Sequence, residues 1–204
     1  MNVSIIILNH NHKRFLDKCI RSVLSCNYPE NKLQIIVSDN GSRDGSIEMV
    51  KIKYPSVFLI ENKRNLGFSK GNNIAIKYAL QSKADIIILL NNDTLLDGSC
   101  IKEIARAMKQ RDVGIVGCKI YYPNTKIIQE LGFYLHPSGY PVPAVDVPKI
   151  DDHFFNQFEV DYISGCALAI KKEVIEKIGL LDPIFTAYFE DADWCLRAKK
   201  VGYK

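Results

Sequence analysis

The stretch Ala84–Thr94, ADIIILLNNDT, joins a run of apolar residues directly to two amides and a carboxylate. A short continuous apolar run bounded by polar residues is typical of a strand that is buried on both faces of a sheet. The stretch therefore predicts a central strand that delivers Asn91, Asn92 and Asp93 to the edge of a sheet.

The residues before this stretch repeat the same pattern three times. Apolar runs predict strands over residues 3–8, 33–40 and 56–62, and helical spacing predicts helices over residues 13–26, 41–54 and 69–82. Alternating strands and helices form βαβ units with right-handed connections and a mostly parallel sheet. The polar strand ends should then meet at the edge where ligands bind in such folds.

The second half of the chain is less regular. A helix is expected over residues 98–110, a strand over 113–122, a strand followed by a helix over 160–179, and a last helix beginning near Glu190. Residues 123–160 hold five of the eight prolines, so they predict irregular structure or short hairpins.

Composition excludes several classes of protein. The 204 residues carry a net charge of only +4, so we expect no nucleic-acid partner. The six cysteines have neither zinc-site nor CxxC spacing, which predicts free thiols in a reducing compartment. No segment has the length of a signal-peptide core or a membrane span. A cytoplasmic protein is expected, with docking at the inner face of the membrane left open.

Two stretches in the first half suggest donor chemistry. Mg²⁺ often takes one or two carboxylates together with substrate phosphates, so Asp93 is a candidate metal ligand. Asp39, at the end of the second predicted strand, is placed to accept a hydrogen bond from a base. The stretch NKRNLGFSKGNN, residues 62–73, combines cations with glycines beside a predicted helix start, which suits a phosphate. The alternatives are turn-capping side chains and a solvated basic turn.

The stretch AYFEDADWCLR, residues 187–197, clusters acids at a predicted helix start. Acids cap helix N-termini, and the helix dipole also favours an ionised carboxylate of the kind that a general base requires. Asp193 and Arg197 have the spacing of a helical ion pair. Tyr188, Phe189 and Trp194 flank the acids and are candidates to line a sugar site.

Taken in order, VSIIILNHNH, IIVSDNGSRDGS, NLGFSKGNNIAI, LLNNDT and the region from Val160 to Tyr203 resemble the family-two inverting glycosyltransferases of the GT-A fold, nearest the rhamnosyltransferase-like branch. VSDNGSRDGS and FEDADWCLR are the most specific motifs. The resemblance implies one three-layer α/β/α GT-A domain over residues 1–204 with a mostly parallel sheet. Its nucleotide-sugar-binding half spans about 1–97 and its acceptor-side half about 98–204.

The resemblance also implies roles for individual residues. Nucleotide-sugar binding is expected of residues from five stretches. Leu8, Asn9 and Asn11 would lie against the base, and Asp39 would bind the base with Asn40 and Ser42 beside it. Gly67, Phe68 and Asn73 would lie near the ribose and diphosphate, Asn91 and Asn92 precede the metal ligand Asp93, and Gly165 would lie near the sugars. Asp191 matches the general base, and Glu190 would support it.

The reaction implied is inverting transfer from a dTDP- or UDP-linked sugar to a hydroxyl of a glycan or lipid-linked acceptor, in cell-surface polysaccharide synthesis, with Mg²⁺ or Mn²⁺. Two departures from the family pattern matter. Asn91-Asn92-Asp93 offers a single carboxylate, which leaves metal dependence open. Related chains continue past the position of Lys204, so a truncated form is expected.

Two other functions remain as alternatives. The reduced metal motif favours a non-catalytic sugar-nucleotide-binding module, whereas the intact acidic motif counts against it. A sugar nucleotidyltransferase would carry a glycine-rich loop after the first strand, and LNHNHKRF, residues 8–15, has no glycine.

Overall fold

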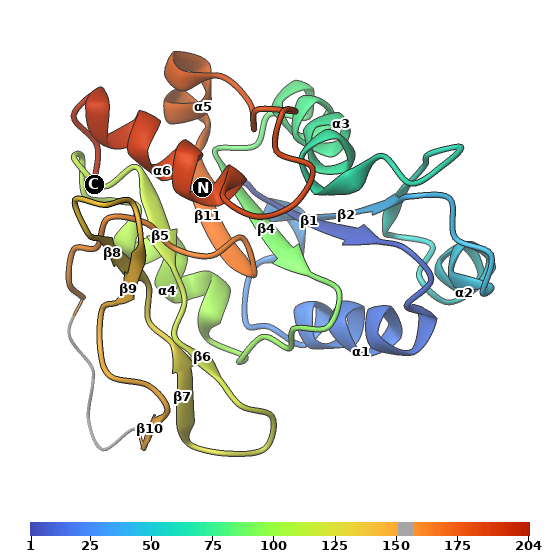
Figure 1. Ribbon diagram of the computed structural model, residues 1–204. Helices are drawn as coiled ribbons and strands as arrows, with labels where there is room; N and C mark the ends of the chain where they lie inside the picture. Colours follow the sequence, from blue (N-terminus) through green and yellow to red (C-terminus); the bar gives the residue numbers. More distant parts are fainter. Residues whose placement is uncertain (151–156) are drawn as a thin grey trace.

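The computed structural model describes residues 1–150 and 157–204 (Figure 1). The main-sheet strands are β1 (Val3–Asn9), β2 (Leu33–Asp39), β3 (Phe58–Glu61), β4 (Ile86–Asn91), β5 (Ile115–Gly117) and β11 (Ala167–Lys171). The helices are α1 (Lys13–Leu24), η1 (Glu30–Lys32), α2 (Ser46–Lys53), α3 (Gly67–Gln81), α4 (Cys100–Ala107), α5 (Lys172–Ile178) and α6 (Glu190–Lys200). The alternation predicted for the first ninety residues is confirmed.

The main sheet, within the described residues, has the order β3-β2-β1-β4-β11-β5. The first four strands in this order are parallel, and β11 pairs antiparallel with both β4 and β5. Asn9 lies opposite Asp39, and Leu8 lies opposite Asn91. The register therefore brings the polar carboxyl ends of β1, β2 and β4 to the same level at one edge of the sheet.

Two apolar cores cover the two faces of this sheet. On one face, Ile5 and Ile88 pack with α1, α2 and α4, together with the other strand residues that point the same way. On the other face, Ile6 and Ile87 pack with α3, α5 and α6. Figure 1 shows α1, α2 and α4 on one side of the sheet and α3, α5 and α6 on the other. Because successive side chains of a strand point to opposite faces, continuous isoleucine runs fill both layers. The result is a three-layer α/β/α domain.

The region from 113 to 160 departs from the single strand predicted at its start. The predicted strand 113–122 is divided into β5 and β6 (Ile120–Tyr121), and β6 turns away to pair with β7 (Ile127–Glu130). Short pairs β7 with β10 (Lys149–Ile150) and β8 (Phe133–Leu135) with β9 (Pro141–Pro143) follow. Short hairpins were expected here; the part of that prediction covering 151–156 lies outside the described residues.

Helix α2 begins later than the sequence suggests. Gly41 and Ser42 precede it, and the helix starts at Ser46 after Gly45 in the left-handed region at φ 80°. Asp44 Oδ1 accepts the Ser46 N–H, which gives a partner to one of the free N–H groups at the start of the helix. Residues 40–44 therefore form a loop at the sheet edge rather than a helical turn.

Two further findings concern the cysteines and the helices. Among the described residues, all six cysteines are free thiols. None of the helices in residues 1–150 and 157–204 is both long and apolar enough to cross a bilayer.

Candidate active site

A buried polar network joins the carboxyl ends of β1, β2 and β4. Asn9 donates through Nδ2 to Asp39 Oδ2 at 2.8 Å and to Ser42 Oγ at 3.1 Å, and its Oδ1 accepts from Asn92 Nδ2 at 2.8 Å. The Ser42 backbone N–H completes the network by donating to Asp39 Oδ1 at 2.7 Å. Buried polar groups need such partners, which explains how apolar strands can end in amides and a carboxylate.

A second set of amides ties this network to the start of α3. Asn40 donates through Nδ2 to Gly67 O at 3.1 Å and to Asn65 Oδ1 at 3.2 Å, and its Oδ1 accepts from Asn62. Gly71 permits the close approach: a Cβ there would lie 2.5 Å from Leu8 Cδ1 and 2.9 Å from Asn40 Oδ1. The segment predicted to pass near the diphosphate is therefore fixed against the ends of β1 and β2.

The residues predicted for the nucleotide divide into two groups by burial. Asn9, Asp39, Asn40 and Asn92 are buried, with their polar side-chain atoms used inside the protein. Leu8, Asn11, Ser42, Asn91 and Asp93 reach the surface. In this structure the first group positions the strand ends, and direct contact of its members with a nucleotide stays a prediction. The second group is accessible to a ligand.

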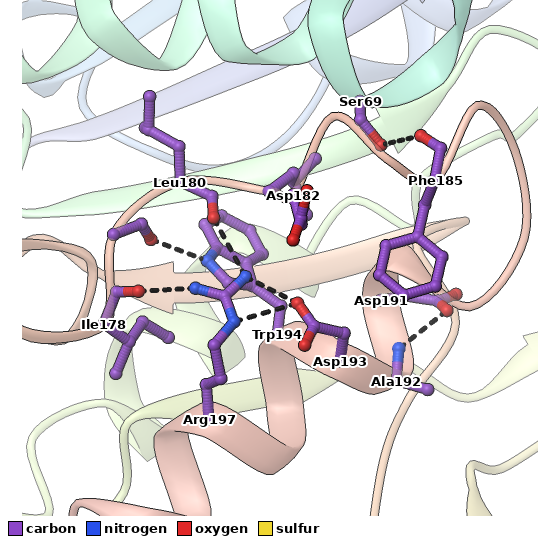
Figure 2. Close-up of polar contacts among 12 residues, drawn as sticks. Ser69, Ile178, Leu180, Asp182, Phe185, Asp191, Ala192, Asp193, Trp194 and Arg197 are labelled. Atoms are coloured by element: carbon purple, nitrogen blue, oxygen red, sulfur yellow. Dashed lines mark hydrogen bonds and ion pairs between the residues drawn. The ribbon is translucent and has the colours of Figure 1, made fainter.

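The predicted general base lies at the start of α6 and is held by two backbone donors. Asp191 Oδ2 accepts the Gly165 N–H at 2.8 Å, and its Oδ1 accepts the Ala192 N–H at 2.8 Å; Figure 2 shows the second of these bonds. A Cβ on Gly165 would lie 3.1 Å from Phe68 Cζ and 3.8 Å from Asp191 Oδ2. The structure thus brings together Gly165, Phe68 and Asp191, which the sequence predicted from three separate stretches.

Glu190, the other acid of the pair, has a different environment. It is 5% exposed, and Oε2 has no hydrogen-bond partner among the described residues. Burial, with the nearby charge of Asp191, raises the pKa of Glu190. The two neighbouring acids therefore have different surroundings. Asp191 is half-buried and accepts two backbone N–H groups, whereas Glu190 is buried and its pKa is raised.

The loop before α6 is fastened to α3 along its length. Asn73 donates to Leu181 O at 2.8 Å and accepts the Leu181 N–H at 3.1 Å, so both ends of its amide are used there. Ser69 Oγ donates to Phe185 O, as Figure 2 shows, and the Phe68 N–H donates to Thr186 O. Asn73 thus positions this loop, and its predicted place near the ribose and diphosphate stays a prediction.

Arg197 anchors the other side of the same loop. It pairs with Asp193 as the spacing predicted, and its remaining N–H groups donate to Ile178 O and Leu180 O (Figure 2). Trp194 was expected to line a sugar site, and that expectation is wrong. Its ring is fully buried and Nε1 donates to Gly179 O, because its place on α6 faces the apolar core.

The aromatic residues preceding the acids are exposed, in contrast to Trp194. Tyr188 and Phe189 are 82% and 53% exposed, and both adopt the left-handed region, at φ 71° and 68°. Non-glycine residues seldom adopt this conformation, and strain of this kind gathers at functional sites. Both rings are accessible to a ligand beside Asp191.

Glu130 on β7 is a residue of this region that the sequence did not single out. Burial raises its pKa, and the charge of Asp191 raises it further. It lies in a segment without periodic pattern, and no motif marks it. Its proximity to Asp191 follows from how β7 packs in three dimensions.

A divalent ion would find one carboxylate at the predicted metal site. Asp93 is exposed. Asn92 donates its side-chain N–H to Asn9, and its Oδ1 lies 3.4 Å from His12 Nδ1. The described residues contain no group of three or more His, Cys, Asp or Glu arranged to hold a metal. A single hard oxygen ligand fits Mg²⁺ or Mn²⁺ when the phosphates of a bound nucleotide supply further ligands.

Comparison with known families decides the classification. The model described as "Glycosyl transferase family 2" matches residues 4–179. The chain belongs to glycosyl transferase family 2. This match covers the strand ends, the α3 segment and Gly165, and it confirms the family resemblance. The acidic motif at residues 189–197 lies outside the matched residues.

Curated relatives of this family-two chain carry related names. It is 25% identical over 206 residues to a low-salt glycan biosynthesis hexosyltransferase of Haloferax volcanii, covering 98% of this chain and 62% of that protein. It is also 25% identical over 181 residues to a dTDP-rhamnosyl transferase of Shigella flexneri, covering 85% of this chain and 56% of the relative. The chain thus spans little more than half the length of these relatives.

Solved structures agree on the fold of the family-two chain. A mannosyltransferase from Pyrobaculum calidifontis, in complex with GDP-Man and Mn²⁺, aligns with a TM-score of 0.74 at 17% identity, over 100% of this chain and 53% of that one. TarS of S. aureus in complex with UDP-GlcNAc aligns with a TM-score of 0.71 at 16% identity, over 97% and 53%. The GT-A fold predicted from the sequence is confirmed.

Proposed function

We propose that this chain is the GT-A domain of an inverting glycosyltransferase that moves a sugar from a nucleotide-diphosphate sugar to a hydroxyl of a glycan or lipid-linked acceptor. The observation that carries the proposal is the joining of Asp191 to Gly165 and Phe68. A half-buried carboxylate oriented by two N–H donors beside exposed aromatic rings has the form of a general base at a sugar site.

Inversion requires the acceptor to attack from the side opposite the leaving group. Asp191 takes the acceptor hydroxyl proton while that oxygen bonds to the anomeric carbon and the bond to the nucleoside diphosphate breaks. In this proposal Glu190, whose pKa burial raises, supports Asp191 from the preceding position of the helix. Residues 1–97 bind the donor in this proposal, and residues 98–204 face the acceptor.

Asp93 would hold Mg²⁺ or Mn²⁺ together with the donor phosphates. The ion, when bound, neutralises charge on the leaving diphosphate. The protein contributes the fixed strand ends and the α3 segment, which Asn40 and Gly71 place beside β1 and β2. The name of the dTDP-rhamnosyl transferase relative supports a dTDP-linked donor, and the solved structure with UDP-GlcNAc supports a UDP-linked one. We further propose a role in surface polysaccharide synthesis at the cytoplasmic face of the membrane.

The general base is tested with Asp191→Asn. Donors are first found by thermal shift with dTDP- and UDP-sugars, since a ligand of the folded state raises Tm. Turnover is then followed by release of the nucleoside diphosphate. Turnover should fall about 10²–10⁴-fold with donor affinity retained. Asp182→Asn, at an exposed aspartate of the same loop, is the matched control and should stay active. Normal turnover by Asp191→Asn would refute the assignment.

The single carboxylate of the metal site favours a second candidate, a sugar-nucleotide-binding module without catalysis. Asp93→Ala separates the metal role from a structural one, because it should weaken UDP binding in Mg²⁺ much more than uridine binding. Equal losses for both ligands would make Asp93 structural. Tight donor binding without turnover by the unaltered chain would support the binding module instead.

A further inference from the structure

Two cysteines outside the candidate active site have their sulfur atoms in contact. The Sγ atoms of Cys100 and Cys118 lie 3.6 Å apart, so that one thiol can donate to the other. Cys100 is the first residue of α4, and Cys118 lies between β5 and β6, where the chain leaves the main sheet. A disulfide bond is about 2.05 Å long, so the two sulfurs need to approach by roughly 1.5 Å to form one.

The backbone on each side of this contact is held by separate hydrogen bonds. The Cys100 N–H donates to Asp97 O at 3.0 Å. Gly117, the residue before Cys118, pairs with Leu168 of β11 in the main sheet. The contact between the two sulfurs therefore joins two fixed points of the fold that are 18 positions apart in the sequence.

Two neighbouring thiols are hydrogen-bonded to oxygen atoms instead. Cys26 Sγ, close to the α4 start, donates to Ser22 O at 3.3 Å and to Asp97 O at 3.4 Å. Cys166 Sγ, on the β11 side, lies 3.2 Å from Thr94 Oγ1. These oxygen partners hold both sulfurs in other contacts, which favours one particular pairing among the cysteines of this region.

The two sulfurs in contact also differ in reactivity. Cys100 and Cys118 are partly buried, and so within reach of a small reagent, whereas Cys19 and Cys195 are buried. The hydrogen bond between the two thiols lowers the pKa of Cys118 and raises the pKa of Cys100, which burial raises further. Because the thiolate is the nucleophile in exchange with a disulfide, Cys118 is the attacking member and Cys100 the resolving one.

We propose that Cys100 and Cys118 form a redox-sensitive pair, which a small-molecule disulfide such as glutathione disulfide oxidises to an intramolecular disulfide that links the start of α4 to the segment between β5 and β6. The Cys118 thiolate, its proton lost to water, attacks one sulfur of the oxidant, forms a mixed disulfide and releases one thiolate, which takes up a proton. The Cys100 sulfur then bonds to Cys118 Sγ, the mixed disulfide breaks, and the second thiolate leaves with the Cys100 proton. The two cysteines together lose two electrons, and the oxidant is reduced to two thiols.

The test incubates the reduced chain with glutathione disulfide, counts free thiols and maps the products by mass spectrometry. The unaltered chain should lose two of its six free thiols without gaining glutathione. Trypsin should then release residues 84–102 and 112–119 as one linked pair of peptides. Cys100→Ser lacks the resolving thiol, so Cys118 should be trapped as a mixed disulfide with glutathione. Retention of all six thiols, or their loss without this linked pair, would overturn the proposal.

Cys166→Ser is the matched control, because Cys166 is also partly buried and lies near Cys118. This variant should give the same linked peptides at the same rate as the unaltered chain. Loss of the linked peptides in Cys166→Ser would mean that the contact between Cys100 and Cys118 does not decide the pairing, and would overturn the proposal.

Thermal unfolding tests whether the link fits the fold. A disulfide constrains the unfolded chain, so oxidation should raise the Tm of the unaltered chain by about 5 °C or more. The same treatment should give Cys100→Ser no such rise, because it cannot form the link. An oxidised chain with a Tm at or below that of the reduced chain would show that the link distorts the structure, and would overturn the proposed connection. None of these measurements depends on sugar transfer.

Discussion

Replacing Asn9 by alanine tests how far the buried network supports the fold. The change removes three hydrogen bonds: to Asp39 at 2.8 Å, to Ser42 at 3.1 Å and from Asn92 at 2.8 Å. It leaves a buried carboxyl oxygen and a buried amide without these partners, at about 1–3 kcal/mol each. A loss of about 3–5 kcal/mol in the free energy of unfolding is expected, which is a large part of the ~5–15 kcal/mol typical of a domain.

Urea unfolding followed by far-UV circular dichroism measures this loss. With a slope of about 2–3 kcal/mol/M for a chain of this size, the midpoint should fall by about 1–2 M. Asn31→Ala, at an exposed asparagine of η1, is the matched control and should change stability by less than about 0.5 kcal/mol. Because Asn9 and Asn92 share one bond, their double alanine variant should lose less than the sum of the single losses.

Equal midpoints for Asn9→Ala and Asn31→Ala would refute the reasoning. They would mean that water replaces the lost partners at the strand ends and that the network does not hold these ends together. Strict additivity of Asn9→Ala and Asn92→Ala would refute the shared bond between the two amides.

Three further predictions concern pH and the α6 loop. Hydrogen bonds from Lys199 and the Leu135 backbone lower the pKa of Asp161, so the stability it contributes is present above its unfolded pKa and is lost as pH falls; Asp161→Asn should flatten the acid side of a Tm–pH profile. Burial raises the pKa of Glu190, so the folded state loses stability as pH rises from the unfolded pKa towards the folded one. The Tm of Glu190→Gln, measured relative to the unaltered chain, should therefore be higher at pH 8 than at pH 4. The same difference in Tm at both pH values would contradict the burial argument. Arg197→Lys cannot reach Asp193 and both loop carbonyls at once, so urea unfolding should show a loss of about 1.5–3 kcal/mol.

Much of the fold followed from local pattern. The isoleucine runs of β1 and β4 identify strands, because a strand buried on both faces of a sheet has a continuous apolar sequence. The spacing in α1 identifies a helix, because a helix buried on one face has apolar residues three or four positions apart. The division between β5 and β6 was missed because Gly117, Cys118 and Lys119 lie between apolar residues, and only pairing with β7 shows where the chain leaves the main sheet.

The candidate site was predictable in its location and less so in its contacts. Polar strand ends place Asn9 and Asn92 at one edge, yet their mutual bond depends on partners 83 residues apart. Trp194 looked like a sugar-binding ring because it stands beside the acids, and the helical turn of α6 directs it into the core. Glu130 had no local signal, since β7 lies in a segment without a periodic pattern.

The N–H of Gly165 that holds Asp191 belongs to the main chain, and this has a consequence for how such a domain can diverge. A substitution can delete a side-chain donor, but every residue type other than proline supplies this one. The backbone conformation thus sets the orientation of the Asp191 carboxylate. Glycine is needed at position 165 only because a side chain there would crowd Phe68. Exposed residues around it, such as Tyr188, can change while the Asp191 carboxylate keeps its orientation.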